Sequence, residues 1–209
     1  MLDWSWKGSV DYGIALEAQR EQRQRRLAGE VGDELWLLEH PAVITVGRRF
    51  VAPMWLPPEI PLFRTERGGL ATCHEPGQLV GYLIADASAC GPKKLVEAIE
   101  AGLIGWLEEQ SVEATRRAGY PGVWVGLAKI AAVGLHLERG VTLHGFALNL
   151  TNSLEGFRWI QPCGIPDAQV TSLARLRGSA PSPDAAAEGV AKRMVVALQD
   201  VLDDGRGLR

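Results

Sequence analysis

The sequence has few cysteines and no excess of basic residues. Only three cysteines occur among 209 residues, and none form the C-x-x-C spacing of a zinc or redox site. So sparse and odd-numbered a set is not a disulfide framework, and it fits a reducing compartment. The formal net charge of −3 provides no basic stripe to neutralise phosphates, which argues against nucleic acid as a partner.

Long apolar runs are also missing. No run approaches the ~20 residues that a membrane-spanning helix needs. The first residues, M-L-D-W-S-W-K-G, lack the apolar core of a signal peptide. We therefore expect a cytoplasmic protein without a membrane partner. A hydrophobic content of 46% suits a compact fold, and we expect residues 1–209 to form one domain.

Hydrophobic periodicity predicts three helices. They are expected at residues 11–28, from Pro92 to about Gln110, and from Ser182 onward. In the first helix Asp11 is the expected N-cap, while Ile14, Ala15 and Ala18 are expected to face inward.

Shorter apolar runs predict strands at residues 34–39, 42–46 and 79–84, the last buried on both faces. Two further runs, 130–138 and 141–150, are separated only by Arg139 and Gly140 and predict a hairpin. The prolines between residues 51 and 61 predict a loop. Because strands and helices do not alternate regularly, we expect an α+β (mixed α/β) fold with a largely antiparallel or mixed sheet.

Cys163 is a candidate nucleophile. It stands between Pro162 and Gly164, in a segment that can be neither regular helix nor regular strand. Such a loop can present a thiol to a pocket, and the thiol becomes reactive if a neighbour lowers its pKa. Lys129 is a candidate for that neighbour. Alternatively, Cys163 is simply a small buried apolar side chain.

The segment R-G-G-L-A-T-C-H-E at residues 67–75 is a candidate binding loop. Its adjacent glycines either let backbone N–H groups approach an oxyanion or simply make a tight turn. It is not a Walker A loop, and no G-x-S-x-G elbow occurs in the chain. His74 and His144 can each be a base, a ligand or a satisfied structural residue. The spacing of the cysteines and histidines argues against a metal site.

Taken together and in order, six segments resemble the lipoyl(octanoyl) transferase family. They are L-E-H-P-A-V-I-T-V-G-R-R at 38–49, R-G-G-L-A-T-C-H-E-P-G-Q-L-V-G-Y at 67–82, G-V-W-V at 122–125, K-I-A-A-V-G at 129–134, H-G-F-A-L-N at 144–149, and P-C-G-I at 162–165 with V-T-S-L at 170–173. Each segment alone is weak, but the ordered set is specific. The resemblance implies a mixed β-sheet flanked by helices, as in biotin and lipoate protein ligases.

This resemblance also implies an activity. The family transfers an octanoyl group from octanoyl-acyl carrier protein to a lysine of a lipoyl domain, the first step of endogenous protein lipoylation. The donor is octanoyl-phosphopantetheine on the carrier protein, and neither ATP nor a metal is needed. The implied acceptors are lipoyl domains of 2-oxoacid dehydrogenases and the glycine cleavage H protein. Residues 1–209 would then form a single catalytic acyltransferase domain.

The family's site residues carry over position by position. Its acyl-carrying cysteine corresponds to Cys163. The lysine that lowers the thiol pKa and shuttles protons corresponds to Lys129. His144 is a possible supporting residue. The implied acyl pocket consists of Arg67, Gly68, Gly69, Leu70, Ala71, Thr72, Cys73, His74, Ala132, Val133, Gly134, Gly145, Phe146 and Ala147.

The chain departs from the family pattern at two positions. Cys73 replaces an aromatic residue, and Glu75 replaces a glycine. We expect Glu75 to point out of the acyl groove, because an unpaired carboxylate is costly to bury there, and we expect Arg67 and His74 at its polar rim. Two alternatives stay open: an ATP-dependent lipoate or biotin-type ligase, and a non-catalytic protein that binds acyl groups or lipoyl domains.

Overall fold

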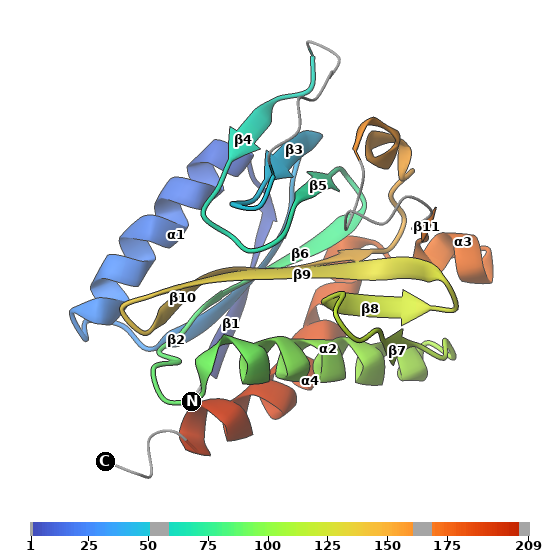
Figure 1. Ribbon diagram of the computed structural model, residues 1–209. Coiled ribbons are helices and arrows are strands. Elements are labelled where there is room, and N and C mark those ends of the chain that lie inside the picture. Colours follow the sequence, from blue (N-terminus) through green and yellow to red (C-terminus); the bar gives the residue numbers. More distant parts are fainter. Residues whose placement is uncertain (1, 51–58, 161–168, 205–209) are drawn as a thin grey trace.

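The computed structural model describes residues 2–50, 59–160 and 169–204. It contains a large mixed sheet with helices on both faces and a small second sheet (Figure 1). The order of strands in the large sheet is β1 (Leu2–Ser9), β2 (Asp33–Glu39), β6 (Gln78–Ile84), β10 (Val141–Asn149), β9 (Ala128–Glu138), β8 (Gly122–Val125) and β7 (Thr115–Arg116). Neighbouring strands on this path are antiparallel except β1 and β2.

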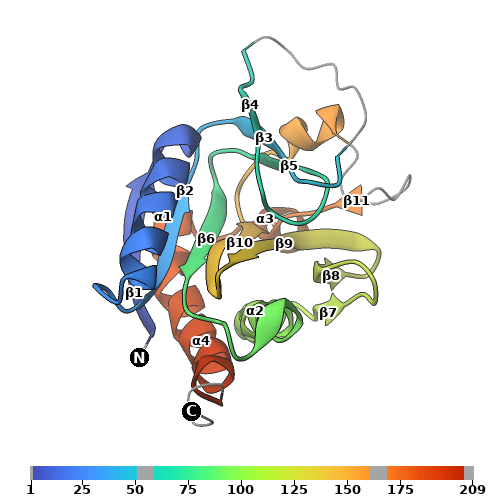
Figure 2. The ribbon, with the colours of Figure 1, turned by 60° about the vertical axis from the view of Figure 1, so that its left-hand side comes forward.

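The central strands are buried on both faces, and their side chains alternate between two cores. In β6, Leu79 and Leu83 face one core, while Val80, Tyr82 and Ile84 face the other. The first core lies under the packed helices α2 (Gly91–Glu109) and α4 (Pro183–Asp204). The second lies under α1 (Tyr12–Leu27), on the opposite face (Figure 2).

The small sheet stands over the end of β6 on the α1 side (Figures 1 and 2). Its strand order is β4 (Leu62–Arg64), β3 (Val43–Val46) and β5 (Ala71–His74). The 3-10 helix η1 (Glu155–Trp159) packs on β5. The strand β11 (Gln169–Val170) pairs in parallel with the start of β9 and leads into the short helix α3 (Leu173–Arg177).

The three predicted helices, the doubly buried strand and the hairpin are all confirmed. Asp11 caps α1 through its side-chain oxygen, which accepts hydrogen bonds from the N–H groups of Gly13 and Ile14. One prediction about α1 is wrong: the Ile14 side chain is 67% exposed, because Tyr12, Ala15 and Leu16 form the buried face. Most of the predicted loop at 51–61 lies outside the described residues.

No helix among the described residues is long and apolar enough to span a membrane.

Candidate functional site

A cavity of about 530 Å³ lies along the edge of β9, beyond the point where its pairing with β8 ends. The loop at 67–70 covers it from the small sheet, and its N–H at Gly68 is hydrogen-bonded to the Leu135 carbonyl of β9, 3.0 Å away. The cavity reaches both faces of the large sheet, because its lining includes Tyr12 of α1 and Val96 of α2.

Every residue assigned to the acyl pocket by resemblance lines this cavity, with one exception. Lining residues are Arg67, Gly68, Gly69, Leu70, Ala71, Thr72, His74, Ala132, Val133, Gly134, Gly145, Phe146 and Ala147, and Lys129 and His144 join them. The fold thus brings together segments that are far apart in the sequence. Whether these residues bind an acyl chain remains a prediction.

Cys73 is the exception. It is 1% exposed and packs with Ile44, Val46 and Phe157 in the core between the small sheet and η1. Burial, with a further contribution from the nearby charge of Glu75, raises the pKa of its thiol to about 12. Such a thiol is protonated at neutral pH, so Cys73 is a structural residue and a poor nucleophile.

Glu75 does not line the cavity, in agreement with the prediction, but it is not directed into solvent. Its carboxylate is buried against the turn that begins η1. One oxygen accepts from the Leu154 N–H at 2.6 Å and from Asn152 at 3.1 Å, and the other accepts from the Gly156 N–H at 3.3 Å. These donors satisfy the buried charge, which is why a carboxylate is tolerated in place of glycine.

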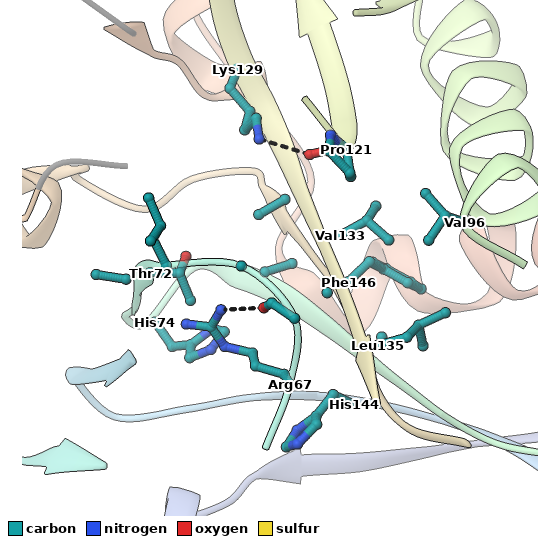
Figure 3. Close-up of a pocket in the computed structure, with 18 of the residues that line it drawn as sticks. Arg67, Thr72, His74, Val96, Pro121, Lys129, Val133, Leu135, His144 and Phe146 are labelled. Carbon is teal, nitrogen blue, oxygen red and sulfur yellow. Dashed lines mark hydrogen bonds between the residues drawn. The ribbon is translucent and has the colours of Figure 1, made fainter. Parts of the chain in front are cut away.

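Lys129 is buried at one end of the cavity (Figure 3). Its ammonium nitrogen Nζ donates to the Pro121 carbonyl at 2.8 Å and lies 4.8 Å from the centre of the Trp124 ring. These contacts restrict the Lys129 side chain to fewer conformations than a surface lysine has. Cys163, its expected partner, lies outside the described residues, so their separation stays a prediction.

Arg67 and His74 were expected at the rim of the cavity, and this expectation is wrong. Both side chains are buried. The Arg67 guanidinium fastens the loop to the small sheet, with Nη2 donating to the Thr45 carbonyl at 2.7 Å and Nη1 donating to the Gly68 carbonyl at 3.0 Å. Burial lowers the pKa of His74 to about 3, and the nearby His40 also lowers it, so this ring is neutral.

A chain of hydrogen bonds connects His74 to the backbone of Lys129. The His74 ring contacts Gln78 at 2.8 Å, and the Gln78 amide donates to Asn149 at 2.9 Å. Asn149 in turn donates to the Thr171 carbonyl at 3.0 Å, and the Thr171 N–H donates to the Lys129 carbonyl at 3.0 Å. Gln78 and Asn149 therefore hold the cavity wall and β11 together.

His144 lies at the far end of the cavity from Lys129 (Figure 3). Its backbone adopts φ +63, a conformation uncommon outside glycine, and its N–H donates to the Gln19 side chain of α1 at 3.0 Å. The ring is buried, and Nε2 has no hydrogen-bond partner among the described residues. Burial lowers the pKa of His144 to about 3, so the ring is neutral at physiological pH.

The cavity has a polar part and an apolar part, separated by β9. Figure 3 shows Arg67, Thr72 and His74 on one side of the strand and Val96, Val133 and Leu135 on the other. On the strand itself, a Cβ added at Gly134 would lie only 3.3 Å from the Gly68 carbonyl oxygen. A glycine at position 134 therefore keeps the space beneath the loop open.

Gly145 lines the cavity, but its lack of a side chain is required for strand pairing. A Cβ at this position would lie 2.2 Å from the Gly81 carbonyl oxygen of β6. The glycine therefore permits close approach of two paired strands, and it does not itself open the cavity.

Sequence reasoning missed several cavity residues. Tyr12 and Tyr82 line the polar part, and burial raises the pKa of Tyr12 to about 12. Two exposed arginines, Arg48 and Arg49, lie at the mouth. These two arginines are the last residues of the segment 38–49 that resembles the family, and this position was the sequence signal that could have identified them. Nothing in the local sequence marks Tyr12, because its place in the wall depends on how α1 packs.

The described residues contain no group of three or more histidine, cysteine, aspartate or glutamate side chains that could hold a metal ion.

Comparison with known proteins gives a consistent result. A family model described as the lipoyl protein ligase A/B catalytic domain matches residues 11–195. An octanoyltransferase from Alkaliphilus metalliredigens is 46% identical over 181 residues, covering 82% of this chain and 83% of that protein.

Solved structures with the same fold have low sequence identity. A bipartite lipoate protein ligase from Thermoplasma acidophilum, from a structural analysis that includes its E2 lipoyl domain, has a TM-score of 0.71 at 14% identity, covering 95% of this chain and 83% of that one. A biotin protein ligase from Aquifex aeolicus has a TM-score of 0.55 at 14% identity, with coverages of 97% and 70%. The expected fold class is confirmed.

Proposed function

This chain belongs to the lipoyl protein ligase A/B catalytic-domain family, and from that membership we propose that it is an octanoyltransferase of protein lipoylation. It transfers an octanoyl group from a carrier-protein thioester to a lysine of a lipoyl domain. The observation that carries this proposal is the agreement between high identity to an octanoyltransferase and a buried lysine at the end of the cavity.

The cavity suits an acyl chain. Its apolar part, formed by Val96, Val133, Leu135 and Phe146, can cover methylene groups, each of which contributes about 0.8 kcal/mol when buried. We place the octanoyl chain in this part, with the reacting carbonyl carbon toward Lys129.

The first half-reaction forms an acyl-enzyme on Cys163. Its thiolate attacks the carbonyl carbon of the octanoyl thioester, and collapse of the tetrahedral intermediate breaks the bond to the pantetheine sulfur, which takes a proton from the Lys129 ammonium and leaves as a thiol. An ammonium about 4 Å from the thiolate, at an effective dielectric constant of about 20, would contribute roughly 4 kcal/mol in favour of the charged form before desolvation opposes it. Lys129 is the group we assign to this role.

In the second half-reaction, the neutral amine of the acceptor lysine attacks the Cys163 thioester. The new amide bond forms as the carbon–sulfur bond breaks, and the amine proton passes to the neutral Lys129 amine, which becomes an ammonium again, or to water. The Cys163 thiolate is regenerated. Because the thioester is already activated, we expect the reaction to need neither ATP nor a metal ion.

The expected partners are those that the resemblance to the octanoyltransferase family implies. We expect the donor to be octanoyl-phosphopantetheine on acyl carrier protein, and the acceptors to be lipoyl domains of 2-oxoacid dehydrogenases and the glycine cleavage H protein. The related ligase from Thermoplasma acidophilum was described with its E2 lipoyl domain, which supports a lipoyl domain as the acceptor.

A transfer assay tests this function. The protein is incubated with octanoyl-acyl carrier protein and a lipoyl domain, without ATP, and the intact mass of the lipoyl domain is measured by mass spectrometry. We expect one octanoyl group on the acceptor lysine. Transfer only from free octanoate with ATP would instead identify a ligase, and binding without any transfer would identify a non-catalytic acyl-binding protein.

A further inference from the structure

A single peptide group, between Pro121 and Gly122, connects Lys129 to a buried carboxylate on α2. The Lys129 ammonium donates to the Pro121 carbonyl oxygen at 2.8 Å. The N–H of the same peptide group, on Gly122, donates to Glu100 Oε1 at 2.7 Å. Because a peptide group is planar and rigid, fixing its N–H end also fixes the direction of its carbonyl.

The charges at the two ends match the polarity of the peptide. The carboxylate lies at the N–H end, which carries partial positive charge, and the ammonium lies at the carbonyl end. Hydrogen bonds in such a chain strengthen one another in a low-dielectric interior. Among the described residues Lys129 forms no ion pair with a carboxylate, and this peptide group is a hydrogen-bonded link between Lys129 and Glu100.

Glu100 is itself held firmly. Its side chain is 7% exposed, and its second oxygen forms an ion pair with Arg116 Nε at 3.2 Å. Arg116 also donates to the Glu97 carbonyl, one turn earlier on α2, at 2.7 Å. Glu100 does not line the cavity. Its carboxylate can therefore influence the site only through the groups it holds.

Gly122 makes this arrangement possible. Its φ is +129, and a Cβ at this position would lie 2.4 Å from the Ala131 carbonyl oxygen and 3.2 Å from Lys129 Nζ. The peptide chain thus passes directly against the amine-bearing end of the lysine. Any side chain at position 122 would push the peptide group and the ammonium apart.

We propose that Glu100 is a positioning residue for acyl transfer, which holds the Lys129 ammonium at the cavity by fixing the Pro121–Gly122 peptide group. This inference rests on the proposed function, in which Lys129 takes part in catalysis. Glu100 itself touches no substrate.

Two conservative variants distinguish the effect of side-chain length at position 100 from the effect of its charge. Glu100→Gln keeps an oxygen at the same distance from the Gly122 N–H but removes the charge, whereas Glu100→Asp keeps the charge but is too short to reach. We expect kcat of Glu100→Asp and Glu100→Ala to fall by about tenfold to 100-fold, as for a misplaced catalytic group. Glu100→Gln, which keeps the hydrogen-bond acceptor but loses the charge, should lose clearly less kcat than Glu100→Asp, and KM for the octanoyl donor should not change in any variant.

A matched control and a direct readout complete the test. Glu97→Ala removes an exposed carboxylate from the same helix and should retain full kcat. In proton–nitrogen spectra of lysine-labelled protein, the Lys129 ammonium signal, assigned by its loss in Lys129→Arg, should persist in Glu100→Gln and vanish in Glu100→Asp. Full kcat in Glu100→Asp or Glu100→Ala, or equal losses in Glu100→Gln and Glu100→Asp, would overturn the inference.

Failure of this inference can be told apart from failure of the proposed function. If Lys129→Ala retains full kcat, then Lys129 is not catalytic and the proposed mechanism is wrong. If Lys129→Ala is slow while Glu100→Asp is as fast as the wild type, only the positioning role of Glu100 is wrong. If Glu100→Ala does not fold, Glu100→Asp and Glu100→Gln, which keep a polar group of similar size, still decide the outcome.

Discussion

Several buried polar residues around the cavity obtain their hydrogen bonds from other parts of the protein. Arg67 bonds to carbonyls of two separate segments, and His40 lies between the Tyr82 hydroxyl at 2.7 Å and the Val10 carbonyl at 2.6 Å. Glu75 accepts from two backbone N–H groups. Buried polar groups satisfied in this way fix the cavity wall in one arrangement.

The first residue-scale prediction concerns Glu75. Glu75→Ala leaves the N–H groups of Leu154 and Gly156 without their acceptor, and we expect it to lower the free energy of unfolding by about 2–3 kcal/mol. Chemical denaturation measures this change. Glu155→Ala, which removes an exposed neighbouring carboxylate, is the control and should cost little. Equal stabilities of the two variants would contradict a capping role for Glu75.

The second residue-scale prediction concerns the dependence of stability on pH. Burial lowers the pKa of His74 and of His144 from 6.5 to about 3, so below about pH 6.5 the unfolded chain binds protons that the folded protein does not. Stability should therefore fall as pH decreases from about 7 toward 3, by up to about 1.4 kcal/mol per pH unit for each histidine.

Urea denaturation at several pH values between about 7 and 5 measures this slope. His144→Asn, which tolerates positive φ and does not titrate, should flatten it. An unchanged slope in this variant would show that His144 does not contribute.

At the scale of elements, periodicity in the sequence was sufficient for the long helices, for β6 and for the β9–β10 hairpin. It was insufficient for β1, because Leu2–Ser9 pairs in parallel with a strand about thirty residues later and is only partly buried. Short elements such as β8 and β11 depend entirely on their partners on β9. The residues within such short strands do not by themselves predict this pairing.

The candidate site, too, was only partly predictable from the sequence. Residue types and their order identified the small residues, Lys129 and His74 at the cavity. They did not reveal that Arg67 is buried, or that Glu100 contacts the peptide group that holds Lys129, because both depend on side-chain directions in the folded chain. Ile14 on α1 is a further example: the spacing allowed it to face inward, but packing turned the Tyr12 face inward instead.

The element-scale prediction concerns β9 and the loop that covers it. In Gly134→Val the added side chain would press on the Gly68 carbonyl, only 3.3 Å from the new Cβ, and narrow the cavity. We expect octanoyl transfer to fall at least about tenfold, as a misplaced substrate would cause, while circular dichroism shows a folded protein. Gly32→Val, with nothing within 4 Å of its Cβ, is the control. Full octanoyl transfer by folded Gly134→Val would place the acyl chain elsewhere.

At the scale of the whole molecule, elements on both faces of the large sheet contribute to the cavity. Helices α2 and α4 pack against one face, and α1 and the small sheet cover the other (Figure 2). The cavity opens at the edge of β9, where these layers meet, and Lys129 is held there between β8 and β11. A lysine supported on two sides is preorganised for a reaction at the cavity.

The central claim is a covalent octanoyl-enzyme on Cys163, and intact-mass spectrometry after incubation with octanoyl-acyl carrier protein tests it most directly. We expect the protein to gain one octanoyl group that hydroxylamine removes, peptide mapping to place it on Cys163, and Cys163→Ser not to carry this thioester. An adduct on Cys73 or Cys90, or transfer to the lipoyl domain at full rate by Cys163→Ser, would contradict the claim.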